Sequence, residues 1–294
     1  MMKEDNISDN EIRIIGGSTT PTKSPFKWWI VVLAVATVVA IGLVWGLWPK
    51  TNDDVAGVFE QENIPELSYH LNDWSAMLDT IKRAPAKAIS DLFVFDTIVN
   101  DIPLRMYVPL NSAPHLEIGY DVLTRKNDQI LFFQAADVRG DNLQIVGAFV
   151  QKGKLVSQGM SKRGYCAIID NIVTVGVADN SPLLEQAIEQ NGDFFRQYPL
   201  VDRGSLVESE LKNKSRRRAL CDIGNQIAVV ETQTKESMHD FAQALVDLGV
   251  NNAIYLVGGD AIGWSMDADG HGAEIGLWDK REYKNASFIV WPKK

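Results

Sequence analysis

Residues 234–259, TKESMHDFAQALVDLGVNNAIYLVGG, decide the fold class, because they place an amphipathic helix directly before an apolar strand. The apolar residues of the first half repeat at helical spacing, and they are Met238, Phe241, Ala242, Leu245 and Leu248. We expect Thr234 to cap this helix and Gly249 to end it. The segment AIYLV (253–257) is apolar throughout, which predicts a buried strand.

Short segments rich in β-branched and aromatic residues flank this unit on both sides and predict many further strands. Before it they are LFVFDTIV (92–99), LRMYVPL (104–110), QILFFQAADV (129–138), LQIVGAFV (143–150), KLVSQGM (154–160), YCAIID (165–170) and IVTVGVA (172–178). After it they are WSMDAD (264–269), GAEIGLW (272–278) and SFIVW (287–291). The first two segments surround Asn100-Asp101-Ile102-Pro103, which predicts a β-hairpin.

Two further segments have the features of helices. Residues 67–83 carry apolar side chains at helical spacing. The segment LLEQAIEQ follows Ser181 and Pro182, which suit an N-cap and a first helical position, and Gly192 is a C-terminal stop signal. Many strands with few helices predict an α+β fold, with mixed or antiparallel sheets and two to three flanking helices.

One segment near the N-terminus has the length and composition of a transmembrane helix. Residues 28–48, WWIVVLAVATVVAIGLVWGLW, contain no charged side chain, and a helix of this length spans about 30 Å, the thickness of the hydrocarbon core. Tryptophans lie at both ends, where their rings favour the membrane interface. Lys23 and Lys27 precede the helix, whereas Asp53 and Asp54 soon follow it, so the positive-inside bias predicts a cytoplasmic N-terminus.

These features predict a single-pass protein that is held in the lipid bilayer by an uncleaved anchor. Its predicted parts are a disordered cytoplasmic tail (1–27), the transmembrane helix (28–48), a linker (49–66) and an extracytoplasmic domain (67–294). Which membrane holds it stays open, as does the oligomeric state. The formal net charge of −9 is a poor match to a nucleic-acid binder, so we expect no nucleic-acid partner.

Cysteines and acidic residues give no metal-site pattern. Cys166 and Cys221 either pair in an oxidising compartment or stay buried as free thiols, and the sequence leaves both alternatives open. Without a nearby histidine cluster they are a poor zinc site. The run that starts at Asp267 and includes Asp269 superficially resembles a calcium loop, but it lacks the full ligand pattern, so a hairpin turn is expected. We therefore predict no metal and no cofactor.

The sequence contains no P-loop, no GxSxG and no HExxH, but three segments are candidates for ligand binding. In the first, GDFFRQYPL (192–200), Arg196 and Gln197 either contact a sugar or phosphate or belong to a buried aromatic anchor. In the second, KNKSRRR (212–218), Arg217 and Arg218 are the candidates for phosphate binding, and Arg216 is expected on a solvated loop. In the third, Gly258 and Gly259 let the backbone approach an anion or form a plain tight turn.

The order of these segments resembles the phosphodiester glycosidase family, which includes the enzyme that removes N-acetylglucosamine from a phosphodiester on mannose. The resemblance covers roughly residues 130–270. The segments that carry it are the Val146–Val150 strand end VGAFV, Pro199-Leu200-Val201 with Gly204, the strand with Arg217 and Ala219, QIAVVE, the helix end Leu248-Gly249 and the Asn252–Gly259 segment NAIYLVGG. The chain departs from the family at two positions, because Val146 replaces an asparagine and Val257 replaces an acidic residue.

The resemblance implies a hydrolase that acts on sugar-1-phosphodiesters of envelope glycans or glycolipids. It implies a phosphate cradle from Arg217, Arg218 and the Gly258-Gly259 amides, and it requires a carboxylate, for which the candidates are Asp260, Asp193 and Asp137. The two valines motivate a second hypothesis, a non-catalytic module that binds carbohydrate or phosphoglycan. A third is a structural subunit of an envelope complex. The sugar and the acceptor stay open.

Overall fold

The computed structural model describes residues 91–159, 162–209, 211–267, 269–279 and 284–294, together with Ala76 and Asp79. All of them belong to one compact unit of the chain, Ser68–Lys294. The predicted tail, transmembrane helix and linker lie outside the described residues, and of the helix predicted over 67–83 only Ala76 and Asp79 are described, both helical. No helix within the described ranges is both long and apolar enough to cross a bilayer.

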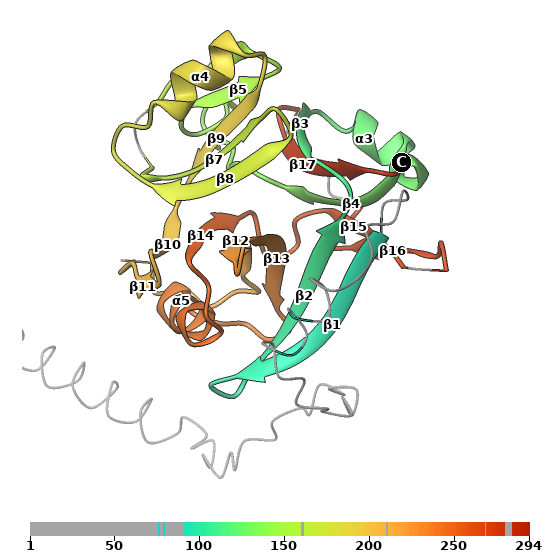
Figure 1. The fold of residues 1–294 in the computed structure, drawn as a ribbon, viewed down its shortest axis with the longest axis vertical. Coiled ribbons are helices and arrows are strands. Elements are labelled where there is room, and N and C mark those ends of the chain that lie inside the picture. Colours follow the sequence, from blue (N-terminus) through green and yellow to red (C-terminus); the bar gives the residue numbers. More distant parts are fainter. Residues whose placement is uncertain are drawn as a thin grey trace, which may run out of the picture. The chain divides into compact units, whose positions relative to one another are not determined.

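Three sheets make up the described domain, and every strand pairing within it is antiparallel (Figure 1). The seven-stranded sheet contains, in spatial order, β1 (Asp91–Val99), β2 (Ile102–Leu110), β13 (Gln226–Thr232), β12 (Arg218–Ile223), β14 (Asn252–Leu256), β10 (Pro199–Asp202) and β11 (Ser205–Leu206). One five-stranded sheet contains β16 (Gly272–Ile275), β15 (Gly263–Met266), β4 (Gln129–Gln134), β17 (Ser287–Pro292) and β3 (His115–Ile118). The other contains β6 (Lys154–Ser157), β5 (Phe149–Gln151), β9 (Asp193–Gln197), β7 (Gly164–Ile169) and β8 (Ile172–Val177).

Three α-helices lie within the described part of residues 91–294, in agreement with the predicted α+β fold. They are α3 (Asp121–Thr124), α4 (Leu183–Glu189) and α5 (Met238–Asp247), and a 3₁₀ helix, η1 (Lys126–Asp128), follows α3. Figure 1 shows α4 against the β9 sheet and α5 beside β10 and β11. The apolar face of α5 packs into the core of the seven-stranded sheet, as its sequence pattern predicts.

The start of α5 corrects one prediction. Its N-cap is Ser237, whose Oγ accepts a hydrogen bond from the amide of Asp240 at 3.0 Å. Thr234, the predicted cap, instead donates its hydroxyl to the Glu236 carboxylate at 2.6 Å. The helix therefore begins at Met238, the first apolar residue of the pattern, and later than a cap at Thr234 would place it, because Ser237 caps it instead.

The predicted hairpin over residues 92–110 is confirmed. Strands β1 and β2 pair in one continuous antiparallel register from Asp91 opposite Leu110 to Val99 opposite Ile102. Asn100 and Asp101 form the connection with φ values of 52° and 61°. Two positive values are those of a type I′ turn, whose twist matches the flanking strands.

The aromatic segment 192–200 forms a central strand. β9 lies between β5 and β7, and Phe194 and Phe195 are fully buried. The Phe194 ring stacks on Tyr165 with centroids 5.8 Å apart. Of the two interpretations that the sequence left open for these aromatics, the buried anchor is therefore the one observed.

The two cysteines are both free and fully buried, Cys166 in β7 and Cys221 in β12. Burial raises the pKa of both thiols, since a thiolate is poorly solvated in an apolar interior. The alternative of a disulfide does not apply to this structure.

Candidate functional site

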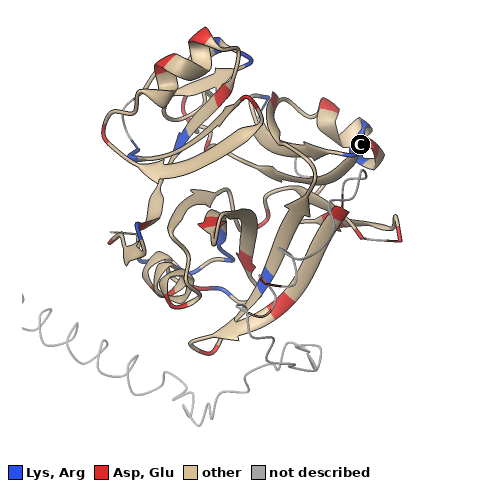
Figure 2. Cartoon of the chain, viewed as in Figure 1, with Lys and Arg blue, Asp and Glu red and all other residues tan. Residues whose placement is uncertain are grey.

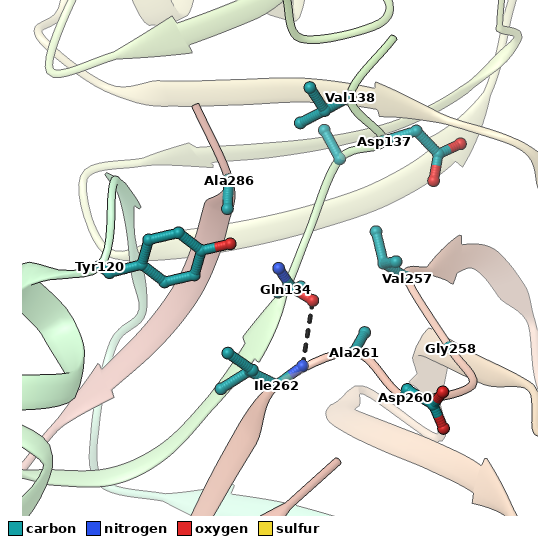
Figure 3. Close-up of a pocket in the computed structure, with 11 residues that line it drawn as sticks. Tyr120, Gln134, Asp137, Val138, Val257, Gly258, Asp260, Ala261, Ile262 and Ala286 are labelled. Atoms are coloured by element: carbon teal, nitrogen blue, oxygen red, sulfur yellow. Dashed lines mark hydrogen bonds between the residues drawn. The ribbon is translucent and has the colours of Figure 1, made fainter. Parts of the chain in front are cut away.

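A cavity of about 500 Å³ opens where the end of β4 meets the loop between β14 and β15 (Figure 3). The charged side chains that line it are Asp137 and Asp260, and Tyr120 and Gln134 add polar groups. The rest of the lining is apolar or backbone and consists of Ala136, Val138, Val257, Gly258, Ala261, Ile262 and Ala286. This combination of apolar wall and few polar groups is typical of a small-molecule site.

The glycine pair after β14 builds one wall of the cavity. Gly258 must be a glycine, because a Cβ atom there would lie 2.5 Å from the carbonyl oxygen of Arg216. Gly259 has a φ of +62°, in the left-handed region that favours glycine. Both amides donate within the protein, Gly258 to the Tyr255 hydroxyl at 3.2 Å and Gly259 to the Arg216 carbonyl at 2.9 Å. The loop is thus a close-packed turn that lines the cavity.

Asp137 is held in the cavity by a buried lysine. The ammonium group of Lys162 donates to the Asp137 carboxylate and, at 2.6 Å, to the amide oxygen of Gln197. It also lies 4.2 Å from the centre of the Tyr198 ring. The Lys162 side chain is 2% exposed and that of Asp137 is 30% exposed. Of these two residues, Asp137 is the one that lines the cavity.

Burial sets the proton affinity of this group of residues. It lowers the pKa of Lys162, and the adjacent Asp137 carboxylate offsets part of that effect by attraction. Burial also raises the pKa of Tyr198, with a further contribution from the negative charge of Asp137. The network therefore contains an ammonium that releases its proton more readily than an exposed lysine does.

Arg218 stabilises the cavity wall from behind. Its guanidinium is fully buried, donates to Glu231 at 3.0 Å and to the carbonyl of Val257 at 2.9 Å, and lies 4.2 Å from the centre of the Phe133 ring. Val257 lines the cavity, so this hydrogen bond fixes the wall at the point where the family pattern has an acidic residue. Arg218 thus supports the wall through Val257, and its Nε is buried without a hydrogen-bond partner among the described residues.

Arg217 and Arg196 are engaged in the same way. Arg217 donates to the carbonyls of Glu236, at 2.9 Å, and Asn213. Arg196 donates to three backbone carbonyls, those of Lys162, Ala178 and Asp179, at 2.8–2.9 Å. Each guanidinium therefore joins chain segments, although the Nε of Arg196 is buried without a hydrogen-bond partner among the described residues. None of the three arginines predicted to bind phosphate lines the cavity.

The structure separates the three candidate carboxylates. Asp137 and Asp260 both line the cavity, and Figure 3 shows Val257 between them. Asp193 is buried elsewhere, at the end of β9 opposite Gln197, where its two oxygens accept the amides of Leu116 at 2.8 Å and Lys152 at 2.6 Å. Asp193 therefore joins two chain segments and is not part of this site.

Gly258 belongs to the site directly, and Gln197 is connected to it through Lys162. Gln197 contacts Asp137 through Lys162, and its amide nitrogen donates to the carbonyl of Ala135 at 3.3 Å. Gly258 lines the cavity, and Gly259 supports the turn beside it. Lys162 is the residue that sequence reasoning missed. Its partners lie 25 and 35 residues away along the chain, and the sequence contains no local signal for them.

The predicted calcium-like run forms a hairpin turn between β15 and β16. Asp267, Asp269 and His271 gather there, all exposed, with their ligand atoms within 4.8 Å of one another. One carboxylate oxygen of Asp267 accepts the amides of Asp269 at 3.0 Å and His271 at 2.7 Å. The acidic residue thus closes the turn, as expected from the sequence.

No protein-family model matches the chain, and none of the curated proteins matches it in sequence. Among solved structures it is similar to the zebrafish N-acetylglucosamine-1-phosphodiester alpha-N-acetylglucosaminidase catalytic domain auto-inhibited by pro-peptide, with a TM-score of 0.51 and 14% identity over 72% of this chain and 86% of that chain. The similarity shows that the two domains share a fold. The sequence identity is low, so the similarity between the two proteins rests on structure alone.

A hypothetical protein from Synechocystis is a second similar structure. The TM-score is 0.52 at 12% identity, over 69% of this chain and 62% of that chain, so the similarity spans less than two thirds of the second protein. Together the two comparisons show similarity of the fold.

Proposed function

We propose that the domain hydrolyses a sugar-1-phosphodiester, with Asp137 as the reacting carboxylate. The observation that carries the proposal is the position of Asp137: this residue lines a cavity in a glycosidase-like fold, and a buried ammonium binds its carboxylate. Glycoside hydrolysis commonly uses carboxylates for acid–base or nucleophilic steps, and a catalytic group has to be held firmly against water and substrate. Lys162 and Gln197 give Asp137 that support.

In the proposed reaction the bond between the anomeric carbon and the phosphate oxygen breaks, and a bond from a water oxygen to that carbon forms. The phosphate monoester leaves with the electron pair of the broken bond. Asp137 either removes a proton from the attacking water or attacks the anomeric carbon first, and the two routes give products of opposite anomeric configuration. Lys162 acts as a positioning residue, because its ammonium contacts Asp137 and is shielded from the cavity.

The test is to offer the intact chain the methyl phosphodiesters of several sugar 1-phosphates, beginning with N-acetylglucosamine. Release of methyl phosphate is followed by ³¹P NMR and the anomer of the free sugar by ¹H NMR. We expect release from at least one sugar, loss of release in Asp137→Asn, and normal release in the matched control Asp141→Asn, which changes an exposed carboxylate outside the cavity lining. Absence of release from every sugar would overturn the proposal.

The engaged arginines favour a second candidate function, carbohydrate binding without hydrolysis. Arg196, Arg217 and Arg218 donate to protein carbonyls or to Glu231, so the described cavity is lined by no cationic side chain. A cavity with two carboxylates, a tyrosine and a glutamine still suits the hydroxyl groups of a sugar. Saturable binding of a methyl glycoside, with no product from the matching phosphodiester, would support carbohydrate binding without hydrolysis.

We also propose that residues 28–48 anchor the domain in a membrane, with the domain on the extracytoplasmic side and envelope glycans or glycolipids as substrates. The support is the uncharged 28–48 segment and the lysines before it. In sealed vesicles of known orientation, protease should digest a C-terminal tag only from the extracytoplasmic side. Extraction of the chain by alkaline carbonate, or digestion from the opposite side, would contradict the anchor or its orientation.

A further inference from the structure

Three consecutive arginines, Arg216 to Arg218, span the end of a loop and the start of β12. They differ in their exposure to solvent. Arg217 and Arg218 are buried, whereas Arg216 is exposed, as are Lys212 and Lys214 on the same loop. None of these three exposed cations forms an ion pair within the described ranges. In the view of Figure 2, basic and acidic positions are interspersed over the domain, so a run of three unpaired cations on one short loop is a local feature.

This loop lies directly against the cavity wall. The carbonyl of Arg216 accepts the amide of Gly259 at 2.9 Å, and the backbone of Gly258 approaches the same carbonyl so closely that a Cβ atom would collide with it. Gly258 lines the cavity. The exposed cations are therefore carried on the loop that backs the Gly258 wall.

The loop is also built to keep its shape. Ser215 and Glu236 exchange two backbone hydrogen bonds, at 3.1 Å and 2.8 Å. Arg217 donates to the carbonyls of Asn213 and Glu236, which ties the loop to the segment before α5. These hydrogen bonds hold the loop at Ser215 and Arg217, and Lys212, Lys214 and Arg216 beside them are exposed.

We propose that Lys212, Lys214 and Arg216 form an anion-recognition rim beside the cavity, which binds the phosphate of a ligand whose sugar occupies the cavity. The proposal rests on the proposed function for the identity of the sugar site. Its own basis is the sorting of charge: the charged side chains that line the cavity are acidic, and the unpaired cations lie on the adjoining loop. The charge of a sugar phosphodiester is distributed in a matching way, because its ring is neutral and rich in hydroxyl groups and its phosphate is anionic.

The charges favour one orientation of the ligand, with its phosphate at the rim. A phosphate inside the cavity would approach Asp137 and Asp260, whereas one at the rim is within reach of a guanidinium that can donate two hydrogen bonds to its oxygens. Exposed charges interact over about 8 Å at physiological salt, so the rim acts on groups close to the loop and its effect weakens as salt is added. The rim therefore selects anionic sugars and sets which end of the ligand points outward.

The test uses inorganic phosphate as the probe and is independent of turnover. The intact chain, labelled with [¹⁵N]glycine, is titrated with sodium phosphate and, in parallel, with sodium chloride at the same ionic strength. We expect saturable shifts of the Gly258 and Gly259 amide signals with phosphate only. Lys214→Ala/Arg216→Ala should raise the apparent Kd about tenfold or more. Arg203→Ala, which removes an exposed arginine from the β10–β11 turn, should leave it unchanged.

Two results would overturn the rim: equal shifts with phosphate and chloride, or equal phosphate affinity in the double variant and the wild type. If phosphate binds at the rim but no sugar phosphodiester is hydrolysed, the rim stands and the proposed hydrolysis fails. If a phosphodiester is hydrolysed with the same KM in the double variant and in the wild type, hydrolysis stands and the rim fails.

Discussion

The buried ammonium of Lys162 pairs with the carboxylate of Asp137, and the two side chains differ sharply in exposure, 2% against 30%. Lys162 does not line the cavity itself, so it acts on the cavity only through Asp137. Its second hydrogen bond, to Gln197, joins the pair to the end of β9. The orientation of Asp137 is thus set by the core of the domain.

Replacement of Lys162 by methionine should change how stability depends on pH. Burial lowers the folded-state pKa of Lys162 below 10.5, the value for the unfolded chain. Between these two values the unfolded state binds more protons at Lys162 than the folded state, so this residue adds a contribution to the free energy of unfolding that rises with pH. Lys162→Met removes this contribution. In chemical denaturation across the alkaline window, the difference in free energy of unfolding between wild type and variant should increase with pH, and a constant difference would refute the shifted lysine.

Removal of the Glu231 charge should destabilise the domain strongly. Glu231→Gln leaves the Arg218 guanidinium buried without its counter-charge, which typically costs about 3–5 kcal/mol. The double variant Glu231→Leu/Arg218→Met removes both charges and should recover much of that loss. Urea unfolding of the single and double variants measures this. Equal stability of Glu231→Gln and wild type would show that the pair is not buried as the structure has it.

Gly258→Ala should damage the cavity wall because the new methyl group meets the Arg216 carbonyl. Displacement of one of the two loops is expected to cost about 1–3 kcal/mol and to weaken phosphate binding at the rim. Gly140→Ala is the matched control, since a Cβ atom there meets nothing within 4 Å. Thermal unfolding and the phosphate titration give the two readouts, and a wild-type result for Gly258→Ala in both would contradict the contact.

Asp193→Asn should reduce stability and leave activity alone. The asparagine keeps only one acceptor oxygen, so one of the amides of Leu116 and Lys152 loses its partner, at a cost of about 1–3 kcal/mol. The kcat of the folded protein should match that of the wild type, because Asp193 lies away from the cavity. A large loss of kcat at wild-type stability would return Asp193 to the list of catalytic candidates.

Much of the fold was predictable from local patterns. The β1–β2 hairpin follows from two strand-like segments around Asn100 and Asp101, and α5 follows from apolar spacing that ends at Gly249. These signals are local because each element is formed by neighbours in sequence. The N-cap at Ser237 was missed, because Thr234 was expected to cap although Ser237 directly precedes Met238, the first apolar residue of the pattern.

The candidate site was predictable only in part, because burial and pairing depend on distant residues. Asp137, Asp260 and Gly258 were identified from sequence and lie together. The exposed position of Arg216 agrees with the expectation of a solvated loop, but the arginine run gave no local sign that Arg218 would be buried against Glu231. That assignment depends on strand pairing between β12 and β13, which places Arg218 opposite Glu231.

The most direct measurement of the central claim is kcat for hydrolysis of the responsive sugar phosphodiester by wild type, Asp137→Asn and Asp141→Asn, with binding of the parent methyl glycoside measured beside it. We expect Asp137→Asn to lose about 100-fold or more in kcat while it binds the glycoside within a few-fold of the wild-type Kd, and Asp141→Asn to match the wild type in both. Wild-type turnover in Asp137→Asn would contradict the assignment of Asp137 as the reacting carboxylate.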